Sequence, residues 1–429
     1  MSRRWDATEA GADIGAQLCS KMANKPKFVI LVATIHYQRN GGFQNFLNAV
    51  NSKLPPGTPI VGGTFSGFAT NAGCFTRGAA ALAVYHDRMQ VTAGNGRDIK
   101  RAPVDAARSC VAMLRGGGAP KYEHNYLFEF CSSGTVPKYS RLGVRRVLKL
   151  PVALHGFINP LLSVLTTVFQ VGAGREEEVI EKVASEMPYH MIMGGSTSDD
   201  NRWETSYQFF NNTTLTNSFV ALSVNTIIGC SVASQTGFKP TGITMKPTKI
   251  GNFGCSIVEL DNQPALYQFT SKIGWPQELF DERLHRRTLY YPLGLKDENG
   301  EYLRLIGLVI GSNLVFSNRV RPAELGVYTA SGASLIGAVD TAISEIKTKG
   351  LDPGFLFVVS CTTRLEALGA YIYAEQEKLK KAFGDAPFLI LFASGEDSVG
   401  ASGRWVRRNE SFNVFSFYEK RDPSELRSS

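Results

Sequence analysis

The sequence predicts an α/β protein of mixed sheets with helices packed on them. Three observations support this fold class. An apolar run, a helical pattern and a second apolar run follow one another three times along the 429 residues. Each of these units is followed by alternating polar and apolar residues, the pattern of antiparallel strands with one solvated face. The apolar fraction of 43% and the charged fraction of 20% are those of an ordinary globular protein. The sequence thus predicts a β-α-β unit plus antiparallel strands, pseudo-repeated three times.

The first unit begins with the continuous apolar run 28–34, which is typical of a parallel strand buried on both faces. Helical spacing of three and four follows, at Phe43, Phe46, Leu47, Val50 and Leu54. The second strand, 59–61, leads into Gly62, Gly63, Thr64, Phe65 and Ser66. Alternating strands are expected over 80–84 and 89–91.

The second and third units have the same order of elements. In the second, strand 126–133 precedes helix positions 179–187 and strand 190–193, which leads into Gly194, Gly195, Ser196, Thr197 and Ser198. In the third, strand 355–361 precedes helix positions 368–383 and strand 388–392, which leads into Ala393, Ser394, Gly395 and Glu396. Further antiparallel strands are expected over 219–224, 227–232 and 412–418.

The second unit carries an insertion between Gly134 and Arg175, which contains the uncharged segment 150–174. Only 161–171 has a helical composition there, about half the roughly 20 residues that a bilayer-spanning helix needs. The N-terminal residues lack the apolar stretch that is typical of a signal peptide. Seven widely spaced cysteines without a Cys-x-x-Cys pair argue against a disulfide framework or a zinc site. We therefore expect a soluble, cytoplasmic protein without stable membrane insertion and without a cofactor.

Four segments make up the expected domain organisation. Residues 1–26 form an N-terminal extension with a helix, 27–235 hold the first two units, and 421–429 are a tail. The domain 236–420 combines the third unit with an antiparallel insertion over 237–335. That insertion has an alternating stretch at 244–261, a short helix opening at 263–267, and strands at 291–294 and 302–309 around a hairpin turn at 297–300.

The ends of the predicted parallel strands are the candidate ligand site. In open α/β sheets, ligands bind in the crevice beyond the carboxyl ends of the strands. Paired glycines at these ends leave the backbone open to a ligand or, alternatively, make a tight turn. The predicted ligand-binding residues are Gly62, Gly63, Thr64, Ser66, Gly194, Gly195, Ser196, Asp199, Asp200, Cys361, Arg364, Gly395 and Glu396.

The charges among these residues suit a small zwitterion such as an amino acid. A guanidinium at Arg364 would bind a carboxylate with two hydrogen bonds, and Asp199 or Glu396 would face the ammonium group. The alternative for Arg364 is a structural ion pair with Glu396.

With these residues in view, the sequence resembles the FIST family of paired N- and C-terminal FIST domains. The resemblance covers about 28–417 and rests on short motifs in a fixed order: 60–64, 78–82, 194–200, 258–265, 291–294, 360–364, 395–396 and 409–412. It implies an intracellular sensory module of signal transduction that binds small ligands such as amino acids. It also adds Asn409 to the predicted ligand-binding residues. A stand-alone sensor of this kind would report to a protein partner that the sequence does not identify.

Two other functions stay open. The sequence favours a binding protein over an enzyme, and the second hypothesis is a hydrolase of amide or ester bonds that uses Cys361 or one of the serines Ser66, Ser198 and Ser398. The third is an interaction protein at a nucleic acid or acidic membrane surface. It rests on the net charge of +8 and on basic groups at 138–149, 283–287 and 404–408, for which solvated surface charge is the simpler explanation. We do not expect nucleic acid to be a partner.

Overall fold

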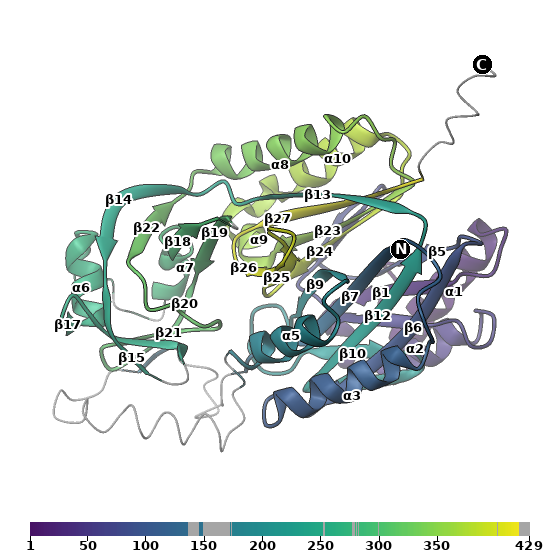
Figure 1. Ribbon diagram of the computed structural model, residues 1–429, viewed down its shortest axis with the longest axis horizontal. Helices are drawn as coiled ribbons and strands as arrows, with labels where there is room; N and C mark the ends of the chain where they lie inside the picture. The colour runs from purple at the N-terminus through teal and green to yellow at the C-terminus, as the bar shows by residue number, and fades with distance from the viewer. Residues whose placement is uncertain are drawn as a thin grey trace.

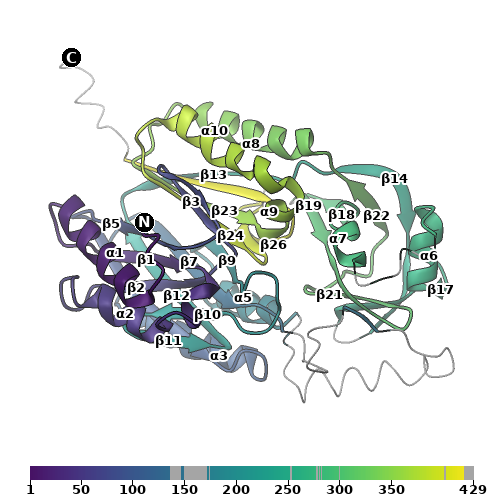
Figure 2. The ribbon, with the colours of Figure 1, turned by 180° about the vertical axis from the view of Figure 1, so that it is seen from behind.

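A computed structural model of the protein describes residues 1–135, 146–148, 172, 174–251, 254–276, 279, 281, 283–298, 300–400 and 402–419. These residues form a body of three sheets and a second lobe of two further sheets (Figures 1 and 2). The predicted helix 161–171 and the basic residues Arg141, Arg145 and Lys149 lie outside the described residues. Within the part of the chain that the structure describes, no helix has the length and apolar character needed to cross a membrane.

The first unit forms a sheet with the strand order β11-β10-β2-β1-β5. Its central strands β1 (Phe28–Ala33) and β2 (Ile60–Thr64) are parallel and fully buried, as the apolar runs predict. The other strands are β5 (Ala79–Val84), β10 (Tyr207–Phe210) and β11 (Thr213–Thr216). The outer face is covered by α1 (Ala7–Lys21) and α2 (Phe43–Asn51), and the 3₁₀ turn η1 (Ile35–Gln38) follows β1.

The second unit forms a sheet with the order β26-β25-β9-β7-β12-β6. Its parallel pair is β7 (His124–Ser132) and β9 (Met191–Thr197). The other strands are β6 (Met89–Arg97), β12 (Ser218–Thr226), β25 (Glu396–Val399) and β26 (Trp405–Arg408). The outer face packs against α3 (Pro103–Arg115) and α5 (Arg175–Glu186).

The third unit forms a sheet with the order β13-β27-β23-β24-β3-β4. Its parallel pair is β23 (Phe355–Cys361) and β24 (Phe388–Ala393), and the other strands are β3 (Phe68–Thr70), β4 (Gly73–Phe75), β13 (Gly229–Gln235) and β27 (Phe412–Tyr418). The expected helix over 368–383 is divided into α9 (Thr362–Leu368), the 3₁₀ turn η5 (Gly369–Ile372) and α10 (Tyr373–Phe383). The division falls at Gly369, whose φ of +52° is not helical. Helix α8 (Gly332–Lys347) covers the sheet beside α10 (Figure 1).

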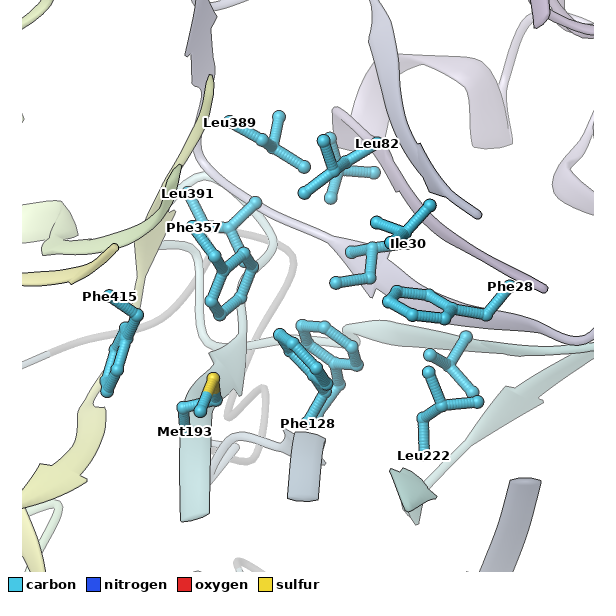
Figure 3. Close-up of a cluster of buried hydrophobic side chains, with 14 of the residues drawn as sticks. Phe28, Ile30, Leu82, Phe128, Met193, Leu222, Phe357, Leu389, Leu391 and Phe415 are labelled. Atoms are coloured by element: carbon cyan, nitrogen blue, oxygen red, sulfur yellow. The ribbon is translucent and has the colours of Figure 1, made fainter. Parts of the chain in front are cut away.

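The inner faces of all three sheets meet in one apolar core. Figure 3 shows this core, to which Ile30 and Leu82 come from the first sheet, Phe128 from the second, and Phe357 and Leu391 from the third. Each unit also gives strands to another sheet: β3 pairs with β24, β10 with β2, and β25 with β9. The β-α-β units and the mixed sheets are therefore confirmed. The equivalence of the three units as copies of one repeat stays a prediction.

The second lobe comes from the predicted antiparallel insertion. One sheet contains β14 (Lys239–Met245), β22 (Leu325–Thr329), β18 (Leu293–Asp297) and β19 (Gly300–Arg304) in this order. The other contains β15 (Pro247–Gly251), β16 (Ser256–Leu260), β21 (Asn313–Phe316), β20 (Ile306–Ile310) and β8 (Val147–Leu148), with β17 (Gln263–Pro264) beside β16. Its helices are α6 (Ala265–Lys272) and α7 (Leu284–Thr288). The hairpin turn at 297–300 is confirmed, but the single strand expected over 302–309 is wrong, because the chain changes sheets between β19 and β20.

Candidate functional site

The glycine-rich ends of the three parallel pairs lie side by side, as the sequence predicts. The backbone N–H of Ser198, after β9, donates to Thr64 O at the end of β2 over 2.7 Å. The N–H of Ser66 donates to Phe392 O of β24 over 3.3 Å, and the N–H of Ser196 donates to Gly395 O over 3.0 Å. The hydroxyls of Ser66 and Ser198 are 2.8 Å apart. The three strand ends are thus joined by direct backbone hydrogen bonds.

Protein atoms fill the space that the glycines leave open. A Cβ atom on Gly194, whose φ is +153°, would stand 1.9 Å from Glu129 O of the neighbouring strand. A Cβ atom on Gly195 would stand 2.4 Å from Gly395 O. These glycines therefore let backbone approach backbone. The ligand-binding role of Gly62, Gly63, Gly194, Gly195 and Gly395 stays a prediction.

We expect the substitution Gly194→Ala to lower the free energy of unfolding by about 1–3 kcal/mol or more, since it adds backbone strain to a close contact. The matched control is Gly337→Ala in α8, where a Cβ atom would meet nothing within 4 Å. That control should raise stability by about 0.5–1 kcal/mol, because alanine is the better helix former. Urea unfolding of both variants measures the difference. Equal stability of the two variants would contradict the packing described here.

Arg364 lies away from the predicted acidic partners. It is fully buried, and its Nε donates to Glu375 Oε1 over 2.8 Å. Its two other nitrogens donate to Thr236 O (3.2 Å) and Leu335 O (2.9 Å). The alternative ion pair with Glu396 is therefore wrong, because α10 brings the carboxylate of Glu375 to the guanidinium instead. In this position Arg364 joins three segments of backbone and side chain.

Asp199 and Asp200 also have structural contacts. The Asp199 carboxylate accepts hydrogen bonds from four consecutive backbone N–H groups, 202–205, over 2.6–3.1 Å. Asp200 pairs with Arg77 at 3.2 Å on the surface. Neither residue faces Arg364 in these contacts. Asp199 therefore shapes the loop that follows β9.

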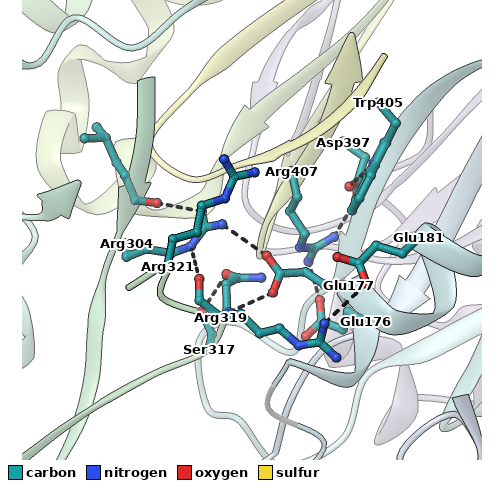
Figure 4. Close-up of polar contacts among 12 residues, drawn as sticks. Glu176, Glu177, Glu181, Arg304, Ser317, Arg319, Arg321, Asp397, Trp405 and Arg407 are labelled. Atoms are coloured by element: carbon teal, nitrogen blue, oxygen red, sulfur yellow. Dashed lines mark hydrogen bonds and ion pairs between the residues drawn. The ribbon is translucent and has the colours of Figure 1, made fainter. Parts of the chain in front are cut away.

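A buried charged cluster lies beside the strand ends; we name Glu129, Glu176, Ser196, Asp397 and Arg407 the Arg407 cluster. Arg407 is paired with Asp397 at 2.5 Å and with Glu176 (Figure 4). Glu176 also accepts a hydrogen bond from the Ser196 hydroxyl. Burial raises the pKa of Glu176 and, with the nearby Asp397, holds the pKa of Glu129 well above its ordinary range. Burial alone would lower the pKa of Arg407, but the surrounding carboxylates raise it. Arg407 is thus held as a cation among carboxyl groups.

A second buried group surrounds Cys361; we name Cys361, Thr363, Glu396, Glu410 and Ser411 the Cys361 cluster. Thr363 donates to Glu410 over 2.6 Å, and the Ser411 hydroxyl donates to Glu396 over 2.9 Å. Burial and these two carboxyl groups raise the pKa of the Cys361 thiol well above its ordinary value. A buried, protonated thiol is a poor nucleophile, which argues against the hydrolase hypothesis for this residue. Predicted Asn409 lies beside the cluster in the chain and is buried.

An open cleft of about 1020 Å³ lies between the third sheet and the second lobe. Its walls come from α8, from residues 230–239 around the β13–β14 connection, and from the β18–β19 hairpin; residues 191, 399, 400 and 408 complete it. Four basic and four acidic side chains line this cleft: Lys239, Lys296, Lys349 and Arg408, and Asp297, Glu298, Glu301 and Glu345. Such a volume lies at the upper end of the roughly 300–1,000 Å³ common for small-molecule sites.

Arg408 lines the cleft and lies opposite Glu396, one of the predicted residues at the strand ends. It is 6% exposed, and its Nη1 donates to Glu301 O over 3.1 Å. Burial lowers the pKa of this guanidinium, while Asp297, Glu301 and Glu396 oppose that effect. Gly300 allows the close approach, since a Cβ atom there would stand 2.8 Å from Arg408 Nη1. Residue 408 pairs with Glu396 across the β25–β26 hairpin, next to the pair of Arg407 with Asp397.

The residues that matter most in this arrangement are not apparent from the sequence. The sequence favours solvated surface charge at 404–408, or a basic patch for nucleic acid or membrane, and both interpretations are wrong for Arg407 and Arg408, which are buried. The available signal was the pattern of Glu396-Asp397 and Arg407-Arg408, two charge pairs that become cross-strand neighbours in a hairpin. Predicted Thr64, Ser66 and Ser196 do lie together at the strand ends, and Cys361 lies with Glu396.

Two models of known protein families match the chain. The FIST N domain matches residues 27–263, and the FIST C domain matches residues 270–398. The chain therefore belongs to the FIST family. Among solved structures, a cyanuric acid hydrolase from A. caulinodans is 7% identical over 97% of each chain, with a TM-score of 0.35. A comparison with curated protein sequences found no match.

FIST domains are sensory domains of signal transduction, and a sensory role follows for this chain. The cleft and the two buried clusters are the candidate sites for such a role. The domain boundary at 235/236 stays a prediction.

Proposed function

We propose that the protein senses a small zwitterionic metabolite of amino-acid-like chemistry, which binds in the cleft, and that it signals to a protein partner. The observation that carries this proposal is the cleft itself: an open volume of about 1020 Å³ lined by four acidic and four basic side chains, one of which is the buried Arg408. A ligand with both charges finds both counter-charges there.

Arg408 is the group that would bind the ligand carboxylate. A guanidinium offers two parallel N–H donors to a carboxylate, and burial strengthens this pairing because water competes less. Glu301 and Glu345 line the same cleft and would face the ammonium group. Their side chains are held by Thr236 (2.7 Å) and Gln235 (2.5 Å) of the β13–β14 connection.

The predicted residues at the strand ends would then support the site from behind. Arg364 binds the carbonyls of Thr236 and Leu335, and Thr236 lines the cleft. The proposed ligand is still a small zwitterion, as in the hypothesis from the sequence, but the guanidinium that binds its carboxylate is that of Arg408 instead of Arg364.

A thermal-shift screen of the full chain tests the proposal. The probes are the common L-amino acids, each compared with its N-acetyl derivative, which lacks the ammonium group, and its amide, which lacks the carboxylate. We expect at least one amino acid to raise Tm, since a ligand at 100 times its Kd stabilises the folded state by about 2.7 kcal/mol. Both derivatives should lose most of this shift.

Arg408→Lys should also lose the shift, because lysine has no two-donor fork. The control Arg108→Lys changes an exposed arginine of α3 and should keep it. A screen without any shift, or a shift that is unchanged in Arg408→Lys, would contradict the proposal.

A further inference from the structure

Two neighbouring glutamates at the start of α5 bind arginines from two different strands. Glu176 pairs with Arg407 of β26. Glu177 Oε1 pairs with Arg304 of β19 at 3.1 Å, and its Oε2 accepts the backbone N–H of Arg319 over 2.7 Å. Figure 4 shows these glutamates between Arg407 on one side and Arg304 and Arg319 on the other.

The same two strands carry residues of the cleft. Arg408 follows Arg407 in β26, and Glu301 precedes Arg304 in β19. On the cleft side the strands are joined by the hydrogen bond from Arg408 Nη1 to Glu301 O (3.1 Å). Each strand is thus tied to α5 by one arginine and to the cleft by another residue.

Because of these contacts, a relative movement of β19 and β26 would also displace α5. Successive residues of a strand point to opposite faces, so Arg407 and Arg408 project to opposite sides of β26. Glu176, Glu177, Arg304 and Arg407 are nearly or fully buried. Breaking a buried ion pair is costly, so α5 must follow the two arginines or lose a contact. Glu181 and Ser185, farther along α5, are exposed.

We propose that the position of α5 depends on whether the cleft is occupied. A ligand that changes the spacing of β19 and β26 would displace Glu176 and Glu177 and, with them, α5, to which a partner can bind. This inference rests on the proposed function for the identity of the ligand, but the mechanical link between the cleft and α5 is a property of the free protein.

Hydrogen exchange of the full, ligand-free chain tests the link. Glu301→Ala removes the side chain that accepts from Thr236 Oγ1 and loosens β19 at the cleft. We expect the amides of 175–186 to exchange about tenfold faster than in the unchanged protein. The matched control Glu298→Ala lies on the same hairpin, exposed at its turn, and should leave α5 unchanged. Amides of α2 report global stability and should stay unchanged in both variants.

The reverse experiment uses reciprocity, because coupling between two sites acts equally in both directions. Glu177→Gln should speed exchange over 300–304 and 405–408, whereas Glu186→Gln at the other end of α5 should not. Unchanged α5 exchange in Glu301→Ala, or equal effects of Glu301→Ala and Glu298→Ala, overturns the inference. If α2 is also faster in Glu301→Ala, the reverse experiment decides: an effect at 300–304 and 405–408 beyond that in α2 supports the link, and its absence overturns it. A negative amino-acid screen with positive exchange results would contradict the proposed ligand alone.

Discussion

Replacing Arg364 with methionine is expected to lower the free energy of unfolding by about 3–5 kcal/mol, because it leaves the carboxylate of Glu375 buried without its cation. Arg364 and Glu375 are both fully buried, at a distance of 2.8 Å between Nε and Oε1. The substitution also leaves the carbonyls of Thr236 and Leu335 without their donors. Chemical unfolding of the full chain measures the loss.

The double substitution Arg364→Met with Glu375→Met separates the cost of the unpaired charge from other effects. It should recover most of the lost stability, since a buried ion pair can be replaced by apolar groups at little cost. In the hypothesis drawn from the sequence, Arg364 instead binds the ligand carboxylate. A stable Arg364→Met protein that has lost ligand binding would therefore support the ligand role and contradict the structure.

Raising the pH from about 5 to 9 is expected to destabilise the protein through the Cys361 cluster. Burial raises the pKa of Glu396 to about 7 and that of Glu410 to about 8, from an ordinary value of 4.5. Between the unfolded and folded pKa values the folded state binds more protons, so the free energy of unfolding falls by up to about 1.4 kcal/mol per pH unit for each group. The stabilising contribution is complete below about pH 4.5 and is lost as the pH rises through about 7 and 8.

The groups that face these two carboxyls do not reverse the upward shift of their pKa values. Hydrogen bonds from Cys361 and Ser411 and the charge of Arg407 lower the pKa of Glu396, but the effect of desolvation, which raises it, is larger. Glu410 is faced by Thr363, Arg364, Glu366 and Glu396, again with desolvation as the largest cause.

Glu410→Gln is the test, because an amide of similar size carries no titrating proton. Its stability should fall less steeply between pH 5 and 8 than that of the unchanged protein, as measured by urea unfolding at each pH. The exposed Glu298→Gln serves as the control and should keep the original slope. An unchanged slope in Glu410→Gln, or stability that rises over this range, would contradict the protonated state of the cluster.

Much of the fold follows from local patterns in the sequence. Continuous apolar runs such as 28–34 and 388–392 became buried parallel strands, since only strands buried on both faces need no alternation. The meeting of Ser66 with Ser198 was also predictable, because the carboxyl ends of parallel strands gather on one edge.

Partner choice among buried charges was not predictable in the same way. Arg364 could be paired with any acid near a strand end, and only the position of α10 brings Glu375 rather than Glu396 to it. The cleft likewise depends on how the second lobe packs against α8, which sets long-range contacts between segments such as 230–239 and 296–301. Composition and spacing carry little information on such contacts.

A crystal structure of the full chain grown with the amino acid that gives the largest thermal shift tests the central claim most directly. The account predicts ligand density in the cleft, with the carboxylate at hydrogen-bonding distance from Arg408 and the ammonium group facing Glu301 or Glu345. Density at another place on the protein, or a ligand in the cleft that does not contact Arg408, would contradict it.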